Sequence, residues 1–488
     1  MSVKKIIKTK DLTIEQKVNA LAKFAENTIE PLKRSDALEA YFQEGIYCEL
    51  FEGNAPFKPR YVTPDYQKYL KQGSKFLGIE PPQDIFEAIN ALLIIYKHVP
   101  SITNFPVYLG NLDELLNPFI EDEALTKKLF KLFLINIDRT ITDSFCHANL
   151  GPNVTKAGNI FLDVIKDLDN PTPNFTLKVG KETSTAFIKK AISASLKVVK
   201  PALADDKVFR KEFKGDYAIA SCYNGLKIGG GGYTLTRLRL NRIANKVNHL
   251  DDFYALLDDV VKENLKQMDR RIDYIVEQSN FFESNFLSRE GLIDKEKFVG
   301  MFGIVGLAEC VNALSEEKFG YSKNANQLGV HILDFIKERL DNHHGHYTSF
   351  FDNKYLLHAQ VGIDTDYDCS AGCRIPIGDE LPIYEHMMQA GLFHPYFPTG
   401  IGDIFVFEKT YKNNIDALVD LMKGAFKSGV RYLTFHTSDS DLIKVTGYLV
   451  KKSEVEKLAK GEAVLRDTTA LGKGANEGTH VFERMVRN

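Results

Sequence analysis

Residues 442–450 have the sequence LIKVTGYLV, an apolar and β-branched run of the kind that forms strands, interrupted by one glycine. A glycine inside such a run usually marks a bulge or a point where another backbone comes close. Gly447 is therefore predicted to lie where a neighbouring group approaches the chain more closely than a side chain would allow.

A second segment, residues 216–225 with the sequence DYAIASCYNG, combines alternating apolar residues with Asn-Gly turn chemistry. Glycines follow at 229–232, so the pattern predicts a strand, a tight hairpin and a returning segment, with Cys222 at the tip. The weak S–H bond and soft sulfur of cysteine suit it to relay an unpaired electron. Two alternatives stay open: Cys222 is a buried structural thiol, or the glycine run is a phosphate cradle. The run has neither the Lys-Ser/Thr ending of a P-loop nor GxGxxG spacing.

Together, and in this order along the chain, the two segments resemble the glycyl radical enzymes. In that superfamily a valine or isoleucine, a small residue, Gly and Tyr surround an α-carbon that stores an unpaired electron, and a thiyl-forming cysteine lies on a hairpin far upstream. The resemblance implies that Gly447 stores the radical and Cys222 forms the thiyl. Only glycine suits the first role, because a Cβ would crowd the planar radical centre.

Four further stretches resemble the YjjI family, a compact branch related to the anaerobic ribonucleotide reductases. They are SFCHANLGP (144–152), PTPNFTL (171–177), FGIVGLAE (302–309) and RDTTALG (466–472). The resemblance covers roughly residues 90–488 and implies an α/β fold. Its barrel would have ten strands in two parallel five-stranded half-sheets, antiparallel to each other, with surrounding helices and a helical N-terminal layer.

The residue pattern along the chain agrees with an α/β fold. The first part is helix-rich, and Thr13 followed by Gln16 predicts a capping box at a helix start. From about Ser144, short β-like runs alternate with helical ones, which favours parallel strands covered by helices. These runs are 174–179, 217–221, 298–305, 355–362 and 432–436. We expect a helix-rich layer over 1–140, an α/β barrel carrying the cysteine hairpin over 141–430 and a glycyl radical domain over 431–488.

Composition narrows the classes of function. With 62 basic and 65 acidic residues the net charge is −3, so nucleic-acid binding has little electrostatic support. The apolar run 91–96 is far shorter than the ~20 residues needed to span a bilayer, and the N-terminus lacks the apolar core of a signal peptide. We expect a cytoplasmic protein without membrane attachment, whose cysteines are free thiols. They stand at positions 48, 146, 222, 310, 369 and 373.

Departures from better-known glycyl radical enzymes restrict the reaction. Pyruvate formate-lyase uses two adjacent cysteines, whereas Ser221 precedes Cys222 here, which disfavours acyl transfer. Dehydratases of the superfamily carry a glutamate two residues after the cysteine. Here that position is Asn224, whose amide can hydrogen-bond a hydroxyl but cannot accept its proton. The paired zinc cysteines of anaerobic ribonucleotide reductases are absent between Cys373 and Gly447, which weakens nucleotide reduction.

Several polar residues are candidates for substrate binding. Beside Asn224 these are His147 and Asn149, expected at the end of the first barrel strand, and Glu309 after a glycine-rich strand. For each, a hydrogen-bonded buried group is an equal alternative. The histidines at 343, 344 and 346 are expected in a solvent-facing turn, and no metal is assigned.

The sequence thus predicts an anaerobic glycyl radical enzyme acting on a small polar metabolite. No bound cofactor is expected, because the radical resides on the protein. The chain lacks the C-x₃-C-x₂-C motif of a radical SAM activase, so the activase must be a separate partner. A homodimer is left open. Three alternatives stay open: ribonucleotide reductase-like or formate acetyltransferase-like activity, a spare glycyl radical protein without catalysis, and a phosphate-ligand binder using the glycine run.

Overall fold

The computed structural model describes residues 2–26, 28, 32–49, 52, 56–360 and 366–487. The helices of its first part are α1 (Val3–Lys8), α2 (Ile14–Glu26), α3 (Asp36–Gln43), α4 (Tyr66–Gln72), α5 (Ile85–Tyr96), α6 (Leu112–Leu116) and α7 (Glu123–Thr140). The later helices are α8 (Lys156–Asp167), α9 (Thr185–Val198), α10 (Asp206–Glu212), α11 (Leu240–Ala244), α12 (Leu250–Asp273), α13 (Phe281–Ser284), α14 (Phe286–Arg289), α15 (Leu307–Leu314), α16 (Lys323–Asn342), α17 (Ile383–Phe393), α18 (Ile415–Ser428), α19 (Lys452–Ala459) and α20 (Thr468–Thr479). Among these described residues, no helix is both long enough and apolar enough to cross a bilayer.

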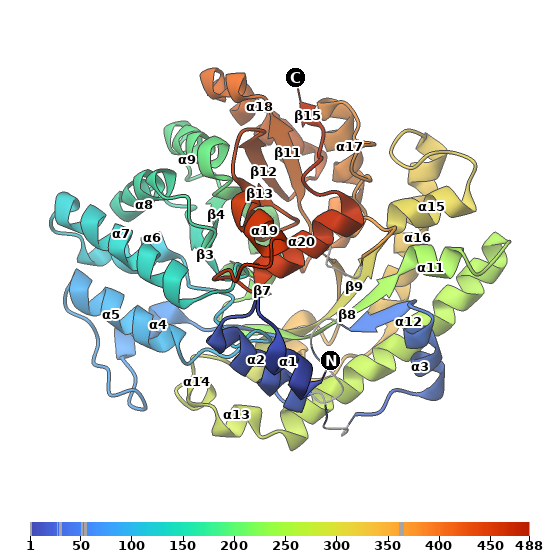
Figure 1. Ribbon diagram of the computed structural model, residues 1–488, viewed down its shortest axis with the longest axis horizontal. Coiled ribbons are helices and arrows are strands. Elements are labelled where there is room, and N and C mark those ends of the chain that lie inside the picture. Colours follow the sequence, from blue (N-terminus) through green and yellow to red (C-terminus); the bar gives the residue numbers. More distant parts are fainter. Residues whose placement is uncertain are drawn as a thin grey trace.

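Two main sheets occupy the centre of the molecule, and helices cover their outer sides (Figure 1). One sheet contains β1 (Tyr47–Glu49), β2 (Tyr61–Thr63), β8 (Gly230–Arg239), β9 (Phe298–Val305) and β10 (Leu356–Ala359). The other contains β3 (His147–Leu150), β4 (Asn174–Val179), β5 (Ala202–Asp205), β11 (Asp403–Phe407), β12 (Tyr432–Thr437) and β15 (Val486–Arg487). Two separate hairpins, β6 (Tyr217–Ala220) with β7 (Asn224–Lys227) and β13 (Leu442–Lys444) with β14 (Leu449–Lys451), complete the strands.

Strand directions differ from the predicted half-sheets. In the first sheet β8, β9 and β10 run parallel, but β1 and β2 are antiparallel to β8. In the second, β3, β4 and β5 run parallel, and β12 joins them antiparallel. The amide of Ala359, at the end of β10, donates to the carbonyl of Gly400, just before β11, at 2.9 Å. The two main sheets nevertheless remain separate and do not form one closed sheet. The α/β class is confirmed, whereas a closed ten-stranded barrel is not.

The strand runs predicted from sequence correspond to strands of the structure. Runs 174–179 and 298–305 match β4 and β9 in full, and the other three match β6, β10 and β12 with slightly different ends. Residues 361–362 of one predicted run lie outside the described residues. Every residue of β9 is buried, as expected for a parallel strand covered on both faces.

The glycine run after the cysteine hairpin packs strands and does not form an anion cradle. Its last three glycines, 230–232, lie in β8 between β2 and β9. A Cβ on Gly230 would lie 2.6 Å from the carbonyl carbon of Lys297, and one on Gly231 would lie 2.9 Å from that of Tyr61. Close packing of three backbones therefore explains the glycines, and the phosphate-cradle interpretation loses its basis.

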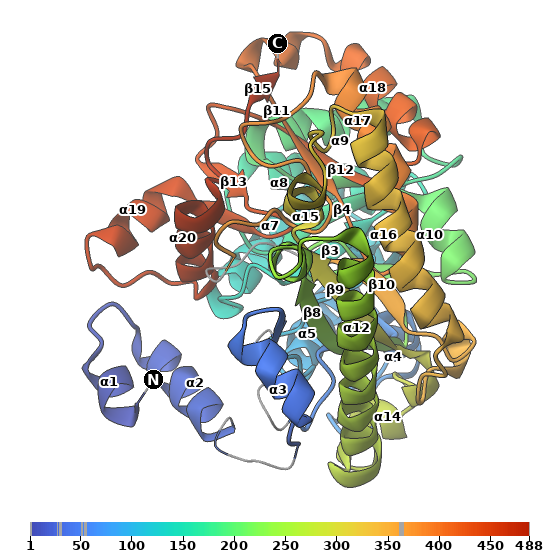
Figure 2. The ribbon, with the colours of Figure 1, turned by 90° about the vertical axis from the view of Figure 1, so that its right-hand side faces the viewer.

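The N-terminal helices lie beside the C-terminal ones. The predicted capping box is confirmed, because the Thr13 amide donates to Oε1 of Gln16 (2.8 Å) and the Gln16 amide donates to Oγ1 of Thr13 (3.2 Å). The Gln16 side chain also donates to the carbonyl of Val464 at 3.2 Å. Helices α1 and α2 accordingly lie next to α19 and α20 at one side of the molecule (Figure 2).

Candidate active site

Gly447 lies at the tip of the hairpin formed by β13 and β14. The two strands pair antiparallel, and the amide of Val445 donates to the carbonyl of Tyr448 at 3.0 Å to close the turn. The predicted continuous strand is thus a tight hairpin. The φ angle of Gly447 lies outside the left-handed region, so its backbone conformation does not demand glycine.

Close contact with Cys222 does demand glycine at this position. A Cβ built on Gly447 would overlap the Cβ of Cys222 and would lie 2.6 Å from its Cα. Two residues 225 positions apart are therefore in direct contact, and both are buried. The prediction of a close backbone approach at Gly447 is confirmed, and the approaching group is the candidate thiyl residue.

Side chains hold every carbonyl of the glycine loop from residue 444 to residue 447. Arg484 donates to the carbonyl of residue 444 at 2.9 Å and also to the carbonyl of residue 445. Arg374 donates to the carbonyl of residue 446 at 3.3 Å, and Asn174 donates to the carbonyl of Gly447 at 2.6 Å. Four consecutive acceptors in a buried loop are thereby satisfied without a sheet partner.

The cysteine hairpin is held by side chains of β3. Asn149 forms a two-way amide pair with Ile219: its Nδ2 donates to the carbonyl and its Oδ1 accepts from the amide, both at 2.8 Å. His147 Nδ1 lies 2.9 Å from the carbonyl of Ser221, and its Nε2 lies 2.8 Å from Oγ1 of Thr176. A carbonyl can only accept, so Nδ1 carries the proton. Burial lowers the pKa of His147 to about 3, and the ring is neutral.

The turn of the cysteine hairpin differs from the prediction. Asn224 and Gly225 lie in β7, and the turn itself consists of residues 221–223. Ser221 adopts a left-handed φ of 57°, and its amide donates to the carbonyl of Val107 at 2.9 Å. The glycine at 225 is required by packing, because a Cβ there would lie 2.8 Å from the ring of Phe213.

The environment of Cys222 keeps its sulfur protonated. Burial raises the pKa of the thiol to about 12, against opposing effects of the Ser221 hydroxyl and Lys444. Cys222 therefore carries the hydrogen atom that a relay to or from a glycine α-carbon requires. It is not the activated thiolate that nucleophilic catalysis uses.

A buried lysine lies on the glycine loop close to the cysteine. Nζ of Lys444 donates to the hydroxyl of Tyr432 at 3.1 Å, and that hydroxyl donates to the carbonyl of Cys222 at 3.4 Å. Burial lowers the pKa of Lys444 to about 7. A chain of two hydrogen bonds thus joins the glycine loop to the cysteine hairpin.

The predicted substrate-binding residues occupy three different environments. Asn224 is buried, and neither its Oδ1 nor its Nδ2 has a partner among the described residues. His147 and Asn149 lie in β3, with His147 at its start and not at its end as expected, and both bond to the cysteine hairpin. Glu309 accepts from the amide (2.8 Å) and hydroxyl (2.7 Å) of Ser370, and so holds a loop.

Several residues of the site were missed by sequence reasoning. They are Asn174, Arg374, Arg484, Lys444 and Tyr432. Asn174 and Lys444 lie inside segments 171–177 and 442–450, which the sequence analysis quotes. Each is a polar residue in an otherwise apolar strand-like run, and that is the signal that could have identified them. Arg374 and Arg484 carry no sequence signal, because surface and buried arginines look alike in a sequence.

The histidines at 343 and 346 bind carboxylates of α12. Nε2 of His343 lies 3.0 Å from Asp269, and Nδ1 of His346 lies 2.7 Å from Asp273. Within the described residues, no group of three or more His, Cys, Asp or Glu side chains is arranged to hold a metal.

Solved structures of other proteins are similar to this one in fold. In fold, the chain is similar to hydroxyproline dehydratase from Clostridioides difficile with trans-4-hydroxy-L-proline bound, with a TM-score of 0.71, 11% identity, and coverage of 100% of this chain and 89% of that one. It is also similar to the anaerobic ribonucleotide reductase from Thermotoga maritima in complex with dATP and CTP, with a TM-score of 0.67, 12% identity, and coverage of 87% and 85%. The fold is therefore that of the glycyl radical enzymes.

Sequence places the chain more narrowly. Residues 12–487 match the family described as "Glycyl radical enzyme YjjI-like". A relative in Haemophilus influenzae is 46% identical over 495 residues, which cover 99% of this chain and 96% of the relative. The chain belongs to the YjjI-like glycyl radical enzyme family.

Proposed function

We propose that this protein is an anaerobic radical enzyme in which Gly447 stores an unpaired electron and Cys222 passes it to a small polar substrate. The contact between Gly447 and Cys222 carries the proposal. A hydrogen atom moves only between atoms in near contact. Gly306 also lies close to a cysteine, Cys369, but Gly306 caps the start of α15 and is not at a hairpin tip.

The proposed chemistry is balanced in hydrogen atoms. A separate radical SAM activase removes one hydrogen atom from Cα of Gly447. An external reductant supplies one electron to S-adenosylmethionine, which is cleaved to methionine and a deoxyadenosyl group that takes up the hydrogen atom. In turnover, the S–H bond of Cys222 breaks as a C–H bond forms at Gly447, which leaves a thiyl. The thiyl takes a hydrogen atom from a substrate carbon, and the reverse transfers restore both residues after the product forms.

The protein's part is to position the reacting atoms and to exclude water and oxygen. Both hairpin tips are buried, and the side chains of Asn174 and His147 hydrogen-bond to a carbonyl of each. We assign His147 and Asn149 to positioning of the cysteine hairpin. We assign Glu309 to support of the loop that contains Ser370, with a substrate contact left as a second hypothesis for all three.

Asn224 is the candidate for direct substrate contact. A fully buried amide with two unused hydrogen-bonding atoms costs free energy unless a ligand or water meets them. It lies two residues after Cys222, at the start of β7, and its amide offers both a donor and an acceptor. A hydroxyl or amino group next to the reacting carbon would match it.

A role as a spare radical carrier without catalysis is less well supported. Such a protein needs the glycine loop alone, yet here three hydrogen bonds from His147 and Asn149 hold the hairpin that carries Cys222. The fold likeness to ribonucleotide reductase keeps nucleotide reduction as a second candidate, and acyl transfer is disfavoured by Ser221. The three-part division of the chain at 140/141 and 430/431, a cytoplasmic location and a homodimer also remain proposals.

Electron spin resonance tests the proposal. Anaerobic incubation with a radical SAM activase, S-adenosylmethionine and a one-electron reductant should give a doublet, because one α-hydrogen remains on Gly447. Gly447→Ala should give no signal, whereas Gly424→Ala, at a helical glycine with open space around it, should behave as wild type. A flat wild-type spectrum with an activase that activates its own partner would refute the assignment.

A further inference from the structure

The turn of the cysteine hairpin packs against the end of β10. The hydroxyl of Tyr223, the residue after Cys222, donates to the carbonyl of Ala359 at 2.9 Å. The amide of Gly225 donates to the carbonyl of Thr399, in the loop before β11, at 3.2 Å. The last residues of β10 therefore lie beside the part of the hairpin that contains the candidate thiyl residue.

His358 of β10 and Asn224 of the cysteine hairpin meet at one glycine. A Cβ added to Gly400 would lie 2.9 Å from Cε1 of His358 and 3.1 Å from Cα of Asn224. The rings of His358 and Tyr223 also lie close, with their centroids 6.1 Å apart. Glycine at position 400 lets β10 and the hairpin approach each other, and both polar residues are buried where they do so.

Gln360 shares a face with His358. Its amide donates to the carbonyl of Ile304 at 3.0 Å, which extends the pairing of β10 with β9 by one residue. Alternate side chains of a strand lie on the same face, and Ala359 between the two contacts Gly372 on the other face. Gln360 is therefore on the side of β10 that faces the cysteine hairpin, and it is also buried.

These three buried side chains are neutral and incompletely hydrogen-bonded. Among the described residues, neither side-chain atom of Asn224 has a partner, and neither does Oε1 of Gln360. Nδ1 of His358 lies 3.1 Å from the carbonyl of Thr399, which can only accept, so Nδ1 carries the proton and Nε2 is an acceptor. Burial lowers the pKa of His358 to about 3, and the ring is neutral.

The cations near the cysteine already have partners. Lys444 and Arg60 both act to lower the pKa of the Cys222 thiol against the larger effect of burial. Arg60 pairs with Glu52 at 3.2 Å, and Lys444 donates to the hydroxyl of Tyr432 at 3.1 Å. An ionised ligand would therefore meet neutral groups in a buried space, which is costly, whereas a hydroxyl can both donate and accept there.

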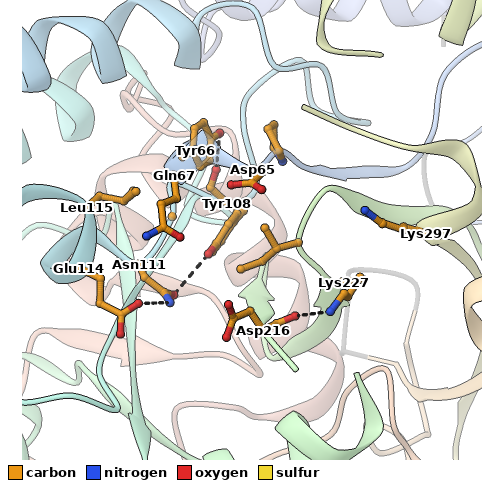
Figure 3. Close-up of a pocket in the computed structure, with 13 residues that line it drawn as sticks. Asp65, Tyr66, Gln67, Tyr108, Asn111, Glu114, Leu115, Asp216, Lys227 and Lys297 are labelled. Atoms are coloured by element: carbon orange, nitrogen blue, oxygen red, sulfur yellow. Dashed lines mark hydrogen bonds between the residues drawn. The ribbon is translucent and has the colours of Figure 1, made fainter. Parts of the chain in front are cut away.

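A polar pocket of about 270 Å³ lies at the opposite end of the cysteine hairpin (Figure 3). Its charged groups are engaged by the protein itself. Asp216 pairs with Arg210 at 3.0 Å, and Nζ of Lys227 donates to the carbonyls of Phe213 (2.9 Å) and Asp216 (3.1 Å). Because Asp216 precedes β6 and Lys227 ends β7, this pocket lies away from Cys222 and is not a candidate for the site of radical transfer.

We infer that His358 and Gln360 form a substrate site together with Asn224, and that this site binds an uncharged polyhydroxy compound through neighbouring hydroxyl groups. One hydroxyl donates to Nε2 of His358, and the amides of Asn224 and Gln360 hold a second. The inference rests on the proposed function and deepens it, because the carbon that bears these hydroxyls would be the one presented to Cys222.

Ligand-detected NMR titration of the unactivated wild-type protein tests this class of ligand. The probes are ethylene glycol, propane-1,2-diol, glycerol and erythritol. Propan-1-ol, with one hydroxyl, and glycerate, with a carboxylate, are the comparisons. We expect at least one of the four probes to bind at least tenfold more tightly than either comparison compound. Absence of saturable binding by all four at high millimolar concentration, or equal affinity of a comparison compound, would overturn the inference.

Matched variants locate the ligand. Asn224→Leu, Gln360→Leu and His358→Asn should each weaken the best probe at least tenfold; the last keeps a donor for the Thr399 carbonyl and removes Nε2. The control is Asn264→Leu in α12, where a buried amide also has no described partner for either side-chain atom. Its affinity should equal that of wild type. Unchanged affinity in all three site variants would refute this site.

Thermal unfolding separates ligand binding from a structural role. A buried amide without a partner costs free energy, so Asn224→Leu and Gln360→Leu should not lower the unfolding midpoint. Asn149→Leu, which removes two hydrogen bonds, should lower it. Lower midpoints in both site variants would show that these amides hold the fold and would refute the inference. Lost binding with a normal doublet would refute this site alone, and a flat spectrum with normal binding would refute the radical assignment alone.

Discussion

The two hairpins that meet at the centre of the molecule are held in different ways. Neutral side chains of β3, a strand of the central sheet, fix the cysteine hairpin. The glycine hairpin is held by two arginines, from the loop at Arg374 and from the C-terminal segment at Arg484, and by Asn174 of β4. The cysteine is therefore built into the sheet, whereas most anchors of the glycine lie outside it.

This difference suits the two proposed roles. A thiyl that must meet a substrate in each turnover needs a fixed position. A glycine that a separate enzyme must reach benefits from anchors that can be released together, and Arg484 alone holds two carbonyls.

The largest expected effect separates storage of the radical from its use. Cys222→Ser should still acquire the Gly447 signal, because activation takes place at the glycine. It should lose turnover completely, because a serine O–H bond is too strong for a glycyl radical to break. Product formation, or solvent deuterium incorporated into substrate, measures this.

The other cysteines serve as controls for that experiment. Cys369→Ser and Cys373→Ser should retain activity if those thiols are structural. Cys146 is fully buried and precedes His147 in the chain, so it is the other candidate for the relay thiol, and Cys146→Ser tests it. If Cys222→Ser turned over and Cys146→Ser did not, the relay residue would be Cys146 and not Cys222.

Oxygen should cut the activated chain at the glycine. A Cα radical reacts with O₂ and breaks the backbone there, so aeration of activated protein should release a fragment that begins at Gly447. Mass spectrometry of aerated samples checks this, with unactivated protein and Gly447→Ala as uncut controls. An intact mass after aeration of protein that shows the doublet would contradict the assignment.

Arg484→Met should loosen the glycine loop and leave the cysteine hairpin in place. Removing the guanidinium leaves two buried carbonyls unsatisfied, at a cost of about 1–3 kcal/mol for each in the free energy of unfolding. We expect a radical that forms several-fold faster and decays faster, measured by the time course of the doublet.

Asn149→Leu tests the anchors of the cysteine hairpin, as Arg484→Met tests those of the glycine hairpin. It removes the amide pair that holds Ile219, so turnover should fall by about tenfold or more with an unchanged radical yield. If Arg484→Met slowed activation, or Asn149→Leu lowered the radical yield instead of turnover, the proposed difference between the anchors would be wrong.

Lys444 should cause a pH dependence of stability. Burial lowers its pKa from 10.5 to about 7, so the unfolded chain binds the proton more tightly between these values. The protein should lose stability as the pH falls from about 10 to 7, with no further loss from this group below 7. Lys444→Met should remove that slope in denaturant titrations at a series of pH values, and Lys473→Met on the surface should not. An identical slope in Lys444→Met would refute this origin.

The glycine and cysteine were predictable because each depends on a local pattern. Gly447 interrupts a β-branched run, and Cys222 follows an alternating strand. The Asn224–Gly225 turn was placed wrongly because packing of Gly225 against the Phe213 ring overrides its turn preference, and Ser221 takes the left-handed conformation instead. The closed barrel was inferred from family likeness, and the strand pairing does not confirm it.

The sequence by itself determined several central strands, the capping box at Thr13 and the close approach at Gly447, because these follow from periodicity and from patterns a few residues long. Only the tertiary structure decided that Gly447 touches Cys222, that Arg374 and Arg484 hold the loop, and that Lys444 reaches Tyr432. These contacts join residues far apart in the chain, and no local pattern encodes which buried donor will meet which carbonyl.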